Sequence, residues 1–152
     1  VEFPVSDEIM SEDYVTPLGK AKIEREGTDA TIVTFSRQVG FSLDAAEALS
    51  KEGLSVEVIN LLSLRPLDRD AIINSVKKTN RLITVEEGWP HCGIGAEISA
   101  IVMETDAFDY LDAPIKTLNG SFSPTPYSPS LESEIIPDSA IIKQKIIDMF
   151  NE

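Results

Sequence analysis

The sequence of 152 residues predicts one α/β domain, with a parallel or mostly parallel sheet covered by helices on both faces. Short β-branched runs alternate along the chain with longer segments whose apolar residues recur at helical spacing, which is typical of βαβ units. The length allows one full core, and a hydrophobic fraction of 42% suits a globular domain. The crossovers of such a sheet are expected to be right-handed.

The first 19 residues show no hydrophobic period, contain two prolines and are rich in acidic residues. We interpret 1–19 as a linker or extended arm and 20–152 as the domain. The domain begins with two β-rich runs, "KAKIER" and "ATIVTFS". Turn-forming residues at Gly27–Asp29 separate them.

The first predicted helix covers 41–53, with Leu43, Ala46 and Leu49 on one face. Gly53 stands where a helix commonly ends with a glycine in the left-handed conformation. The run "SVEVINLL" that follows is β-branched and predicts the next strand.

The second predicted helix covers 66–80, and Asp68 is its expected N-cap. Lys77 and Lys78 fall in its last turn, where the helix dipole favours cations. Its apolar stripe consists of Ile72, Ile73 and Val76. The run "RLITVEE" then predicts a strand.

The last part of the chain contains two more helical patterns, 93–105 and 138–150, on either side of a strand "PIKTLNG" and a Pro/Ser-rich loop at 121–137. Asp138 is the expected N-cap of the final helix. The predicted buried positions of the two helices are Ile94, Ile98, Ile101 and Val102, then Ile142, Ile146, Met149 and Phe150.

A formal charge of −13 argues against binding to nucleic acid or to anionic membrane surfaces, since both need clustered Lys and Arg. The charge favours a basic partner, although solubility alone also explains it. No apolar run approaches the length of a membrane span.

The stretch "TVEEGWPHCGIG", residues 84–95, is the first candidate for an active site, because it contains the only Trp, His and Cys of the sequence. Backbone amides at Gly93–Gly95 could hold a phosphate at a helix start, or the glycines could simply allow a tight turn. His91 and Cys92 are adjacent, so on an extended chain they point to opposite faces and activate each other poorly. A single cysteine provides neither an internal disulfide nor a multi-cysteine metal site. Trp89 between Gly88 and Pro90 is either a core residue or an interface anchor.

We therefore find no catalytic constellation, and we predict no catalytic, cofactor-binding or metal-binding residues in this chain. The ordered motifs "GKAKIEREG", "RPLD", "VEEGWP", "GIGAEI" and "LDAP" nevertheless resemble the C-terminal domain of the beta subunit of the pyruvate dehydrogenase decarboxylating component. The resemblance spans nearly the whole chain, from about Phe3 to Phe150. The broader family is the C-terminal domain shared with transketolase and the branched-chain 2-oxo acid dehydrogenases.

This resemblance implies a three-layer α/β/α domain with a five-stranded mixed sheet, in which "KAKIER" is the candidate for the strand that runs against the others. It implies an enzyme that uses thiamine diphosphate and magnesium to decarboxylate pyruvate and acetylate lipoyl groups, leading to acetyl-CoA. It also implies a heterotetramer of two alpha and two beta subunits. The cofactor would lie outside this chain, which would carry assembly and docking and would be inactive alone.

The resemblance also implies contact residues. The basic subunit-binding domain of dihydrolipoyl acetyltransferase is expected at Asp112 and the chain end, namely Phe150, Asn151 and Glu152. Asp112 could instead cap its own turn before Ala-Pro. Trp89, Pro90 and His91 are expected at a subunit interface.

The sequence departs from the family pattern at Leu62, where Arg is frequent, and at Phe122, where Asp is usual. The contacts of both positions are therefore open. The expected location is the mitochondrial matrix, with a bacterial cytoplasm as the alternative. The alternative functions are the same domain of a branched-chain or transketolase-type enzyme, or a free-standing phosphate-binding module.

Overall fold

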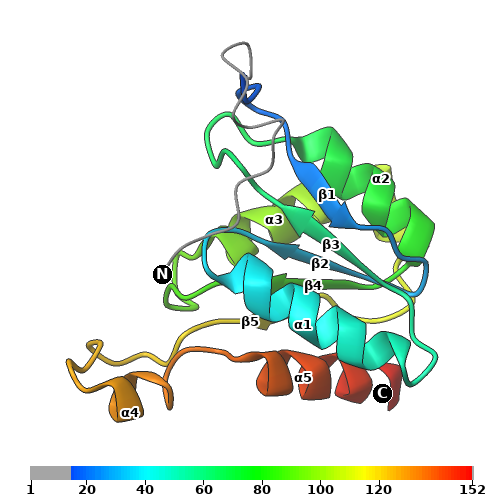
Figure 1. The fold of residues 1–152 in the computed structure, drawn as a ribbon. Helices are drawn as coiled ribbons and strands as arrows, with labels where there is room; N and C mark the ends of the chain where they lie inside the picture. Colours follow the sequence, from blue (N-terminus) through cyan, green and yellow to red (C-terminus); the bar gives the residue numbers. More distant parts are fainter. Residues whose placement is uncertain (1–14, 152) are drawn as a thin grey trace.

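The structure of the chain is a computed structural model that describes residues 15–151. A five-stranded sheet lies at its centre, in the order β1-β3-β2-β4-β5 (Figure 1). The strands are β1 (Lys22–Arg25), β2 (Ala30–Thr34), β3 (Val56–Asn60), β4 (Leu82–Val85) and β5 (Lys116–Leu118). The helices are α1 (Gln38–Ser50), α2 (Arg69–Thr79), α3 (Ile94–Met103), η1 (Asp106–Tyr110), α4 (Pro129–Glu132) and α5 (Ser139–Asn151).

The sheet is mixed, because β1 pairs antiparallel with β3 while the other neighbouring strands are parallel. The prediction that "KAKIER" supplies the odd strand is thus confirmed. In the central register Ile32 lies opposite Val58 on one side and Ile83 on the other. These β-branched neighbours suit a sheet that is buried on both faces.

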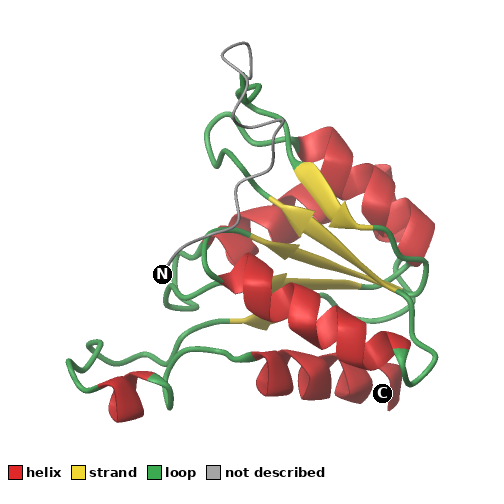
Figure 2. Ribbon diagram, viewed as in Figure 1, coloured by secondary structure: helices red, strands yellow, loops and turns green. Residues whose placement is uncertain are grey.

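Helices cover both faces of the sheet, with α1 and α5 on one side and α2 and α3 on the other (Figure 2). Successive residues of a strand point to opposite faces, so Ile32 packs with the α1 and α5 core and Val33 with the α2 and α3 core. Each face therefore has its own hydrophobic cluster, and the predicted three-layer architecture is confirmed.

Two helix starts follow their expected caps. The Asp68 carboxylate accepts a hydrogen bond from the Ala71 amide at 3.3 Å, and the Asp138 carboxylate accepts one from the Ile141 amide at 2.8 Å. Asn80 ends α2 in a left-handed conformation with φ of 63°. These polar side chains satisfy backbone groups that each helix end leaves open.

Three local predictions need correction. Helix α1 begins at Gln38, three residues before the predicted start, and no side chain caps it. The predicted Pro/Ser loop contains the single turn α4, which starts at Pro129. The one-turn element η1 was not predicted at all, since five residues are too few to show a helical period.

Most of the expected linker, residues 1–14, lies outside the described residues, and Val15–Leu18 are exposed. In the part of the chain from 15 to 151, no helix is both long and apolar enough to cross a membrane.

The chain order creates a switch point next to β2. From β2 the chain passes through α1 to β3 on one side, and then through α2 to β4 on the other side of β2. In open α/β sheets ligands bind beyond the carboxyl ends of the strands at such a point. The loops after β2, β4 and β5 are therefore the first place to look for a site.

Candidate functional site

Glu86, immediately after β4, fills the amino-terminal end of α3. Its buried carboxylate accepts hydrogen bonds from the Gly95 amide at 2.9 Å, the Ile94 amide at 3.2 Å and the Asn119 side-chain amide at 2.9 Å. An anion is favoured there because the first helical amides are otherwise unpaired and the helix dipole is positive at this end. The Glu86 carboxylate thus takes the place that a bound anion could occupy at the start of α3.

The glycines of the "GIG" motif make room for this carboxylate. A Cβ at Gly93 would come within 2.5 Å of a Glu86 carboxylate oxygen, and one at Gly95 would collide with the Thr84 hydroxyl. The amides that could have held a phosphate are already occupied. The alternative of a phosphate-binding module at Gly93–Gly95 is therefore not supported by the structure.

Trp89, Pro90 and His91 lie together on an exposed loop after Glu86. The Trp89 side chain is 47% exposed, so the alternative that it belongs to the core is wrong. Its ring lies 4.7 Å from the ring of Phe122, and its indole N–H donates a hydrogen bond to the Ser123 carbonyl at 3.2 Å. Phe122, the departure from the family's Asp, therefore makes an aromatic contact on this surface.

The structure shows no contact that would make His91 activate Cys92. Both side chains are exposed, and no hydrogen bond joins them within the described residues. Among residues 15–151 there is also no group of three or more His, Cys, Asp or Glu placed to hold a metal ion.

A cavity of about 470 Å³ lies at the switch point beside Trp89. Arg37 lines it, and its guanidinium lies 3.1 Å from a Glu132 carboxylate oxygen and 3.9 Å from one of Glu87. The charge of Arg37 is thus compensated by the chain itself. The other residues that line the cavity include Ser36, Gly120, Ser121, Ser123, Thr125, Ile135 and Ile136.

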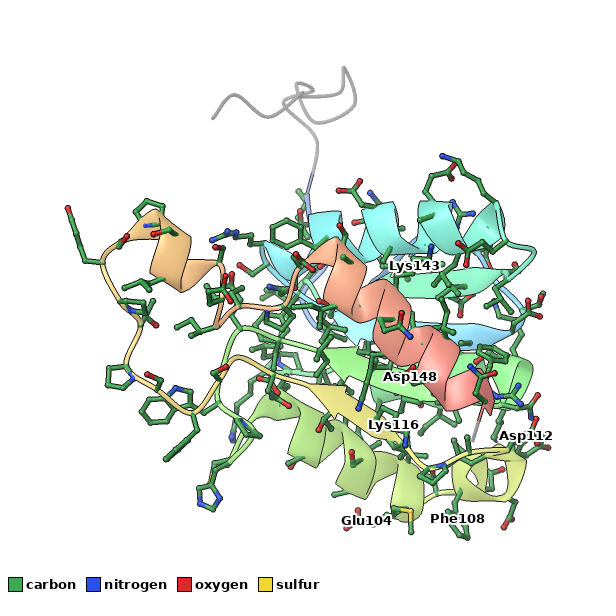
Figure 3. All side chains as sticks on the ribbon, turned by 90° about the horizontal axis from the view of Figure 1, so that it is seen from below. Glu104, Phe108, Asp112, Lys116, Lys143 and Asp148 are labelled. Carbon is green, nitrogen blue, oxygen red and sulfur yellow. The ribbon has the colours of Figure 1, made fainter. Side chains whose placement is uncertain are left out.

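The opposite end of the sheet brings two of the expected partner-binding residues together. Arg81, just before β4, lies with its guanidinium nitrogen 3.9 Å from an Asp112 carboxylate oxygen. The same guanidinium lies over the Phe150 ring, 4.4 Å from the ring centre. Residues far apart in sequence thus share one surface at the end of α5, where Figure 3 shows Asp112 from below.

The backbone around Asp112 is held by Asn80 rather than by the Asp112 carboxylate. The Asp112 amide donates to the Asn80 carbonyl at 2.9 Å, and the Asn80 side-chain amide donates to the Tyr110 carbonyl at 2.7 Å. The Asp112 side chain is 58% exposed, and within residues 15–151 it makes no hydrogen bond to its own turn. It is therefore available to a partner.

The other two expected partner-binding residues are at the chain end. Asn151 is exposed at the end of α5, whereas Glu152 lies outside the described residues. Sequence reasoning missed Arg81 and Asn80, which organise this surface. Their position at the predicted helix end, with Asn80 as its last residue and Arg81 directly after it, was the available signal, but neither residue belongs to a recognisable motif.

The family emerges from comparison with known proteins. Residues 19–142 match the model of the transketolase C-terminal domain. The chain belongs to the transketolase C-terminal domain family. A split-gene transketolase in an inactive tetramer has the same fold, with a TM-score of 0.74 over 93% of this chain and 44% of that one, at 23% identity. A 2-oxoglutarate:ferredoxin oxidoreductase from Magnetococcus marinus is more distant, with a TM-score of 0.58 and 17% identity, covering 94% of this chain and 21% of that one.

Within this family, the transketolase C-terminal domain described here is similar to pyruvate dehydrogenase E1 component subunits beta. It is 58% identical to the Dictyostelium discoideum protein, over 87% of this chain and 37% of that protein. It is 55% identical to the Saccharomyces cerevisiae protein, over 98% and 41%, and 51% identical to the Caenorhabditis elegans protein, over 98% and 42%.

The chain thus spans about two fifths of the length of these relatives. All three carry "mitochondrial" in their names, which supports the expectation of a mitochondrial location over a bacterial one.

Proposed function

We propose that this domain is the C-terminal assembly and docking part of a mitochondrial pyruvate dehydrogenase beta subunit. The observation that carries the proposal is identity of 50% to 58% with eight pyruvate dehydrogenase beta subunits from seven organisms, at coverage of 87% or more of this chain. The whole enzyme would decarboxylate pyruvate and acetylate lipoyl groups.

The cofactor of that enzyme, thiamine diphosphate with magnesium, would be bound outside this chain. When bound, thiamine diphosphate stabilises the carbanion that decarboxylation of a 2-oxo acid leaves. The residues described here do not fit its diphosphate, because the helix start with the required amides is filled by Glu86. The contribution of this chain would therefore be structural, through its surfaces.

One such surface would face the alpha subunit and the second beta subunit of a heterotetramer. Trp89, Pro90 and His91 are exposed on a loop whose backbone is tied to the loop after β5, since the Gly120 amide donates to the Gly88 carbonyl at 3.0 Å. A large aromatic side chain on a fixed backbone loses little freedom when a partner covers it. This supports an interface role for the three residues.

The second surface would receive the basic subunit-binding domain of dihydrolipoyl acetyltransferase. The exposed Asp112 carboxylate, the adjacent Phe150 and the end of α5 with Asn151 and Glu152 would form it. The net charge of −13 would speed the encounter with a basic module. The position of Asp112 next to the chain end supports this assignment.

A transketolase-type enzyme is the less well supported alternative, because the split-gene transketolase is only 23% identical to this chain. The same domain of a branched-chain 2-oxo acid dehydrogenase is the other alternative. Substrate preference of the full protein would decide between the alternatives. We expect faster turnover of pyruvate than of branched 2-oxo acids, and the opposite order would contradict the proposal.

The non-catalytic role can be tested with the purified 152-residue chain. Incubated with pyruvate, thiamine diphosphate and Mg²⁺, it should release no carbon dioxide, whereas the alpha subunit with full-length beta subunit should. Measurable turnover by the chain alone would contradict the proposed division of labour.

A further inference from the structure

An apolar groove of about 570 Å³ adjoins Asp112. Ser99 and Met103 of α3 and Phe108 of η1 line one side, and 111–115 before β5 form the rest. We call it the Met103–Phe108 groove, and Figure 3 shows Phe108 and Asp112 on the face that contains it. Met103 is 56% exposed and Phe108 48%, which is unusual for two large apolar side chains side by side around one groove.

Four carboxylates belong to the segment that lines or adjoins this groove. Glu104 follows Met103 in the chain, Asp106 and Asp109 flank Phe108 within η1, and Asp112 is part of the lining. Asp106 is already paired, since its carboxylate lies 2.7 Å from the Lys77 ammonium nitrogen. Among residues 15–151, the nearest paired cationic nitrogen lies 3.8 Å from the Glu104 carboxylate and 3.9 Å from that of Asp112. Each carboxylate has two oxygens with lone pairs, so both residues can accept further hydrogen bonds from a cationic partner.

We infer that the Met103–Phe108 groove receives a large apolar side chain of the basic domain that docks at Asp112, with Lys or Arg of that domain lying over the surrounding carboxylates. This inference rests on the proposed docking function and gives the docking surface a hydrophobic centre. Interfaces commonly concentrate their binding energy in such an apolar anchor enclosed by a polar rim.

A second copy of this chain fits the groove poorly. A two-fold contact would bring the acidic surface with Glu104 and Asp112 (Figure 3) against the same surface of the other copy. Like charges brought together across an interface are unfavourable, and each copy carries a net charge of −13. A partner with an apolar side chain between basic residues would fill the groove with that side chain and pair its basic residues with the neighbouring carboxylates.

The test measures binding of the recombinant subunit-binding domain of dihydrolipoyl acetyltransferase to the assembled full-length enzyme, by calorimetry at low and at physiological ionic strength. Phe108→Ala and Met103→Ala should each raise the dissociation constant by about tenfold, with an unchanged dependence on salt. Asp112→Asn should raise it too, but with a weaker dependence on salt. Leu62→Ala, which removes a similarly exposed apolar side chain outside the groove, is the matched control and should bind as the wild type does.

The outcomes separate the inference from the proposed function. If Asp112→Asn weakens binding while both groove variants bind normally, the inference is wrong and the docking function stands. If none of the three variants changes binding, the proposed docking site fails and the inference fails with it. If the groove variants alter the assembly state of the enzyme instead, the groove is a subunit contact and the inference is overturned. If Phe108→Ala lowers the melting temperature, the binding measured for Met103→Ala tests the inference instead, because Met103 is the more exposed of the two residues.

Discussion

The Glu86 carboxylate accepts three hydrogen bonds at the start of α3 in a nearly inaccessible position, with 4% of the residue exposed. Those bonds join three parts of the chain, namely the end of β4, the first turn of α3 and Asn119 after β5. A single side chain therefore fixes the loop that carries Trp89. Its neighbour Glu87 is more exposed and reaches only Arg37, at 3.9 Å.

We predict that Glu86→Ala lowers the free energy of unfolding by about 2–4 kcal/mol, because it leaves buried donors without an acceptor. Glu87→Ala is the matched control and should cost below about 1 kcal/mol. Urea unfolding of the 152-residue chain measures both, and we expect one cooperative transition since both cores lie within the chain.

The effect of added sulfate on stability is a second measurement on Glu86→Ala, because sulfate can bind at the helix start that the missing carboxylate leaves open. It should stabilise Glu86→Ala more than the wild type. Equal costs for the two Glu variants would show that the Glu86 bonds are not important for stability.

At the scale of elements, a buried polar network holds α2 against the sheet. The Thr31 hydroxyl lies 2.6 Å from the Ser75 hydroxyl and 2.7 Å from that of Thr79. The fully buried Glu57 of β3 accepts hydrogen bonds from Ser75 and from Lys78 of the same helix. Lys78 also donates to Glu26 at 2.8 Å, which ties the end of β1 to this network.

The pKa of Lys78 carries a prediction for alkaline pH. Burial lowers this pKa, but hydrogen bonds to Glu26 and Glu57 outweigh burial and raise it above its usual value of 10.5. A raised folded-state pKa means that the stabilisation is complete below 10.5 and is lost as the pH rises through the folded value.

Lys78→Met should therefore cost about 2–3 kcal/mol at neutral pH, because Glu57 stays buried without its cation. The difference from the wild type should shrink above the pKa of Lys78. Lys77→Met, which removes an exposed pair with Asp106 and a cation–π contact with the half-exposed Tyr110, is the control and should cost below about 1 kcal/mol. The urea midpoints of the variant and the wild type, measured from neutral pH to above the pKa of Lys78, give this difference. A difference that stays constant with pH would contradict it.

Helices and strands could be predicted from the sequence where residues close together in the chain determine them. Helices α2 and α5 carry both a cap and an apolar stripe, and their positions were predicted closely. Helix α1 starts earlier than predicted because Arg37 provides no side-chain cap that the sequence could reveal. The Asp112 surface depends on Arg81 and Asn80, whose contacts form only once β4, η1 and α5 are assembled. The Glu86 site likewise required the spatial approach of a strand end to a helix start.

At the scale of the whole molecule, two surfaces face different directions from one sheet. The loops at the carboxyl ends of β2, β4 and β5 carry Trp89 and Phe122, while the Asp112 surface lies at the other end of β4. In the proposed function, this separation would let one surface contact neighbouring subunits while the other receives the basic domain.

We predict that Trp89→Ala weakens assembly of the alpha and beta subunits by about 1–2 kcal/mol, as expected for removal of an aromatic anchor. Analytical ultracentrifugation over a range of concentrations would give the dissociation constant. Met103→Ala, which removes an exposed apolar side chain from the other surface, is the control and should assemble as the wild type does. Unchanged assembly of Trp89→Ala would exclude this residue from the interface.

The account rests most heavily on Asp112 as a docking residue. Calorimetry of the subunit-binding domain with the assembled enzyme should show that Asp112→Asn weakens binding by about 2 kcal/mol or more, as for loss of a charge pair within an interface. Asp70→Asn, an exposed carboxylate in the first turn of α2 at the opposite end of that helix from Asn80, is the matched control and should have a much smaller effect. The melting temperature should stay nearly unchanged, because the backbone at Asp112 is held by Asn80. If the substitution instead lowers the melting temperature and leaves docking intact, Asp112 is a turn residue and the account is wrong.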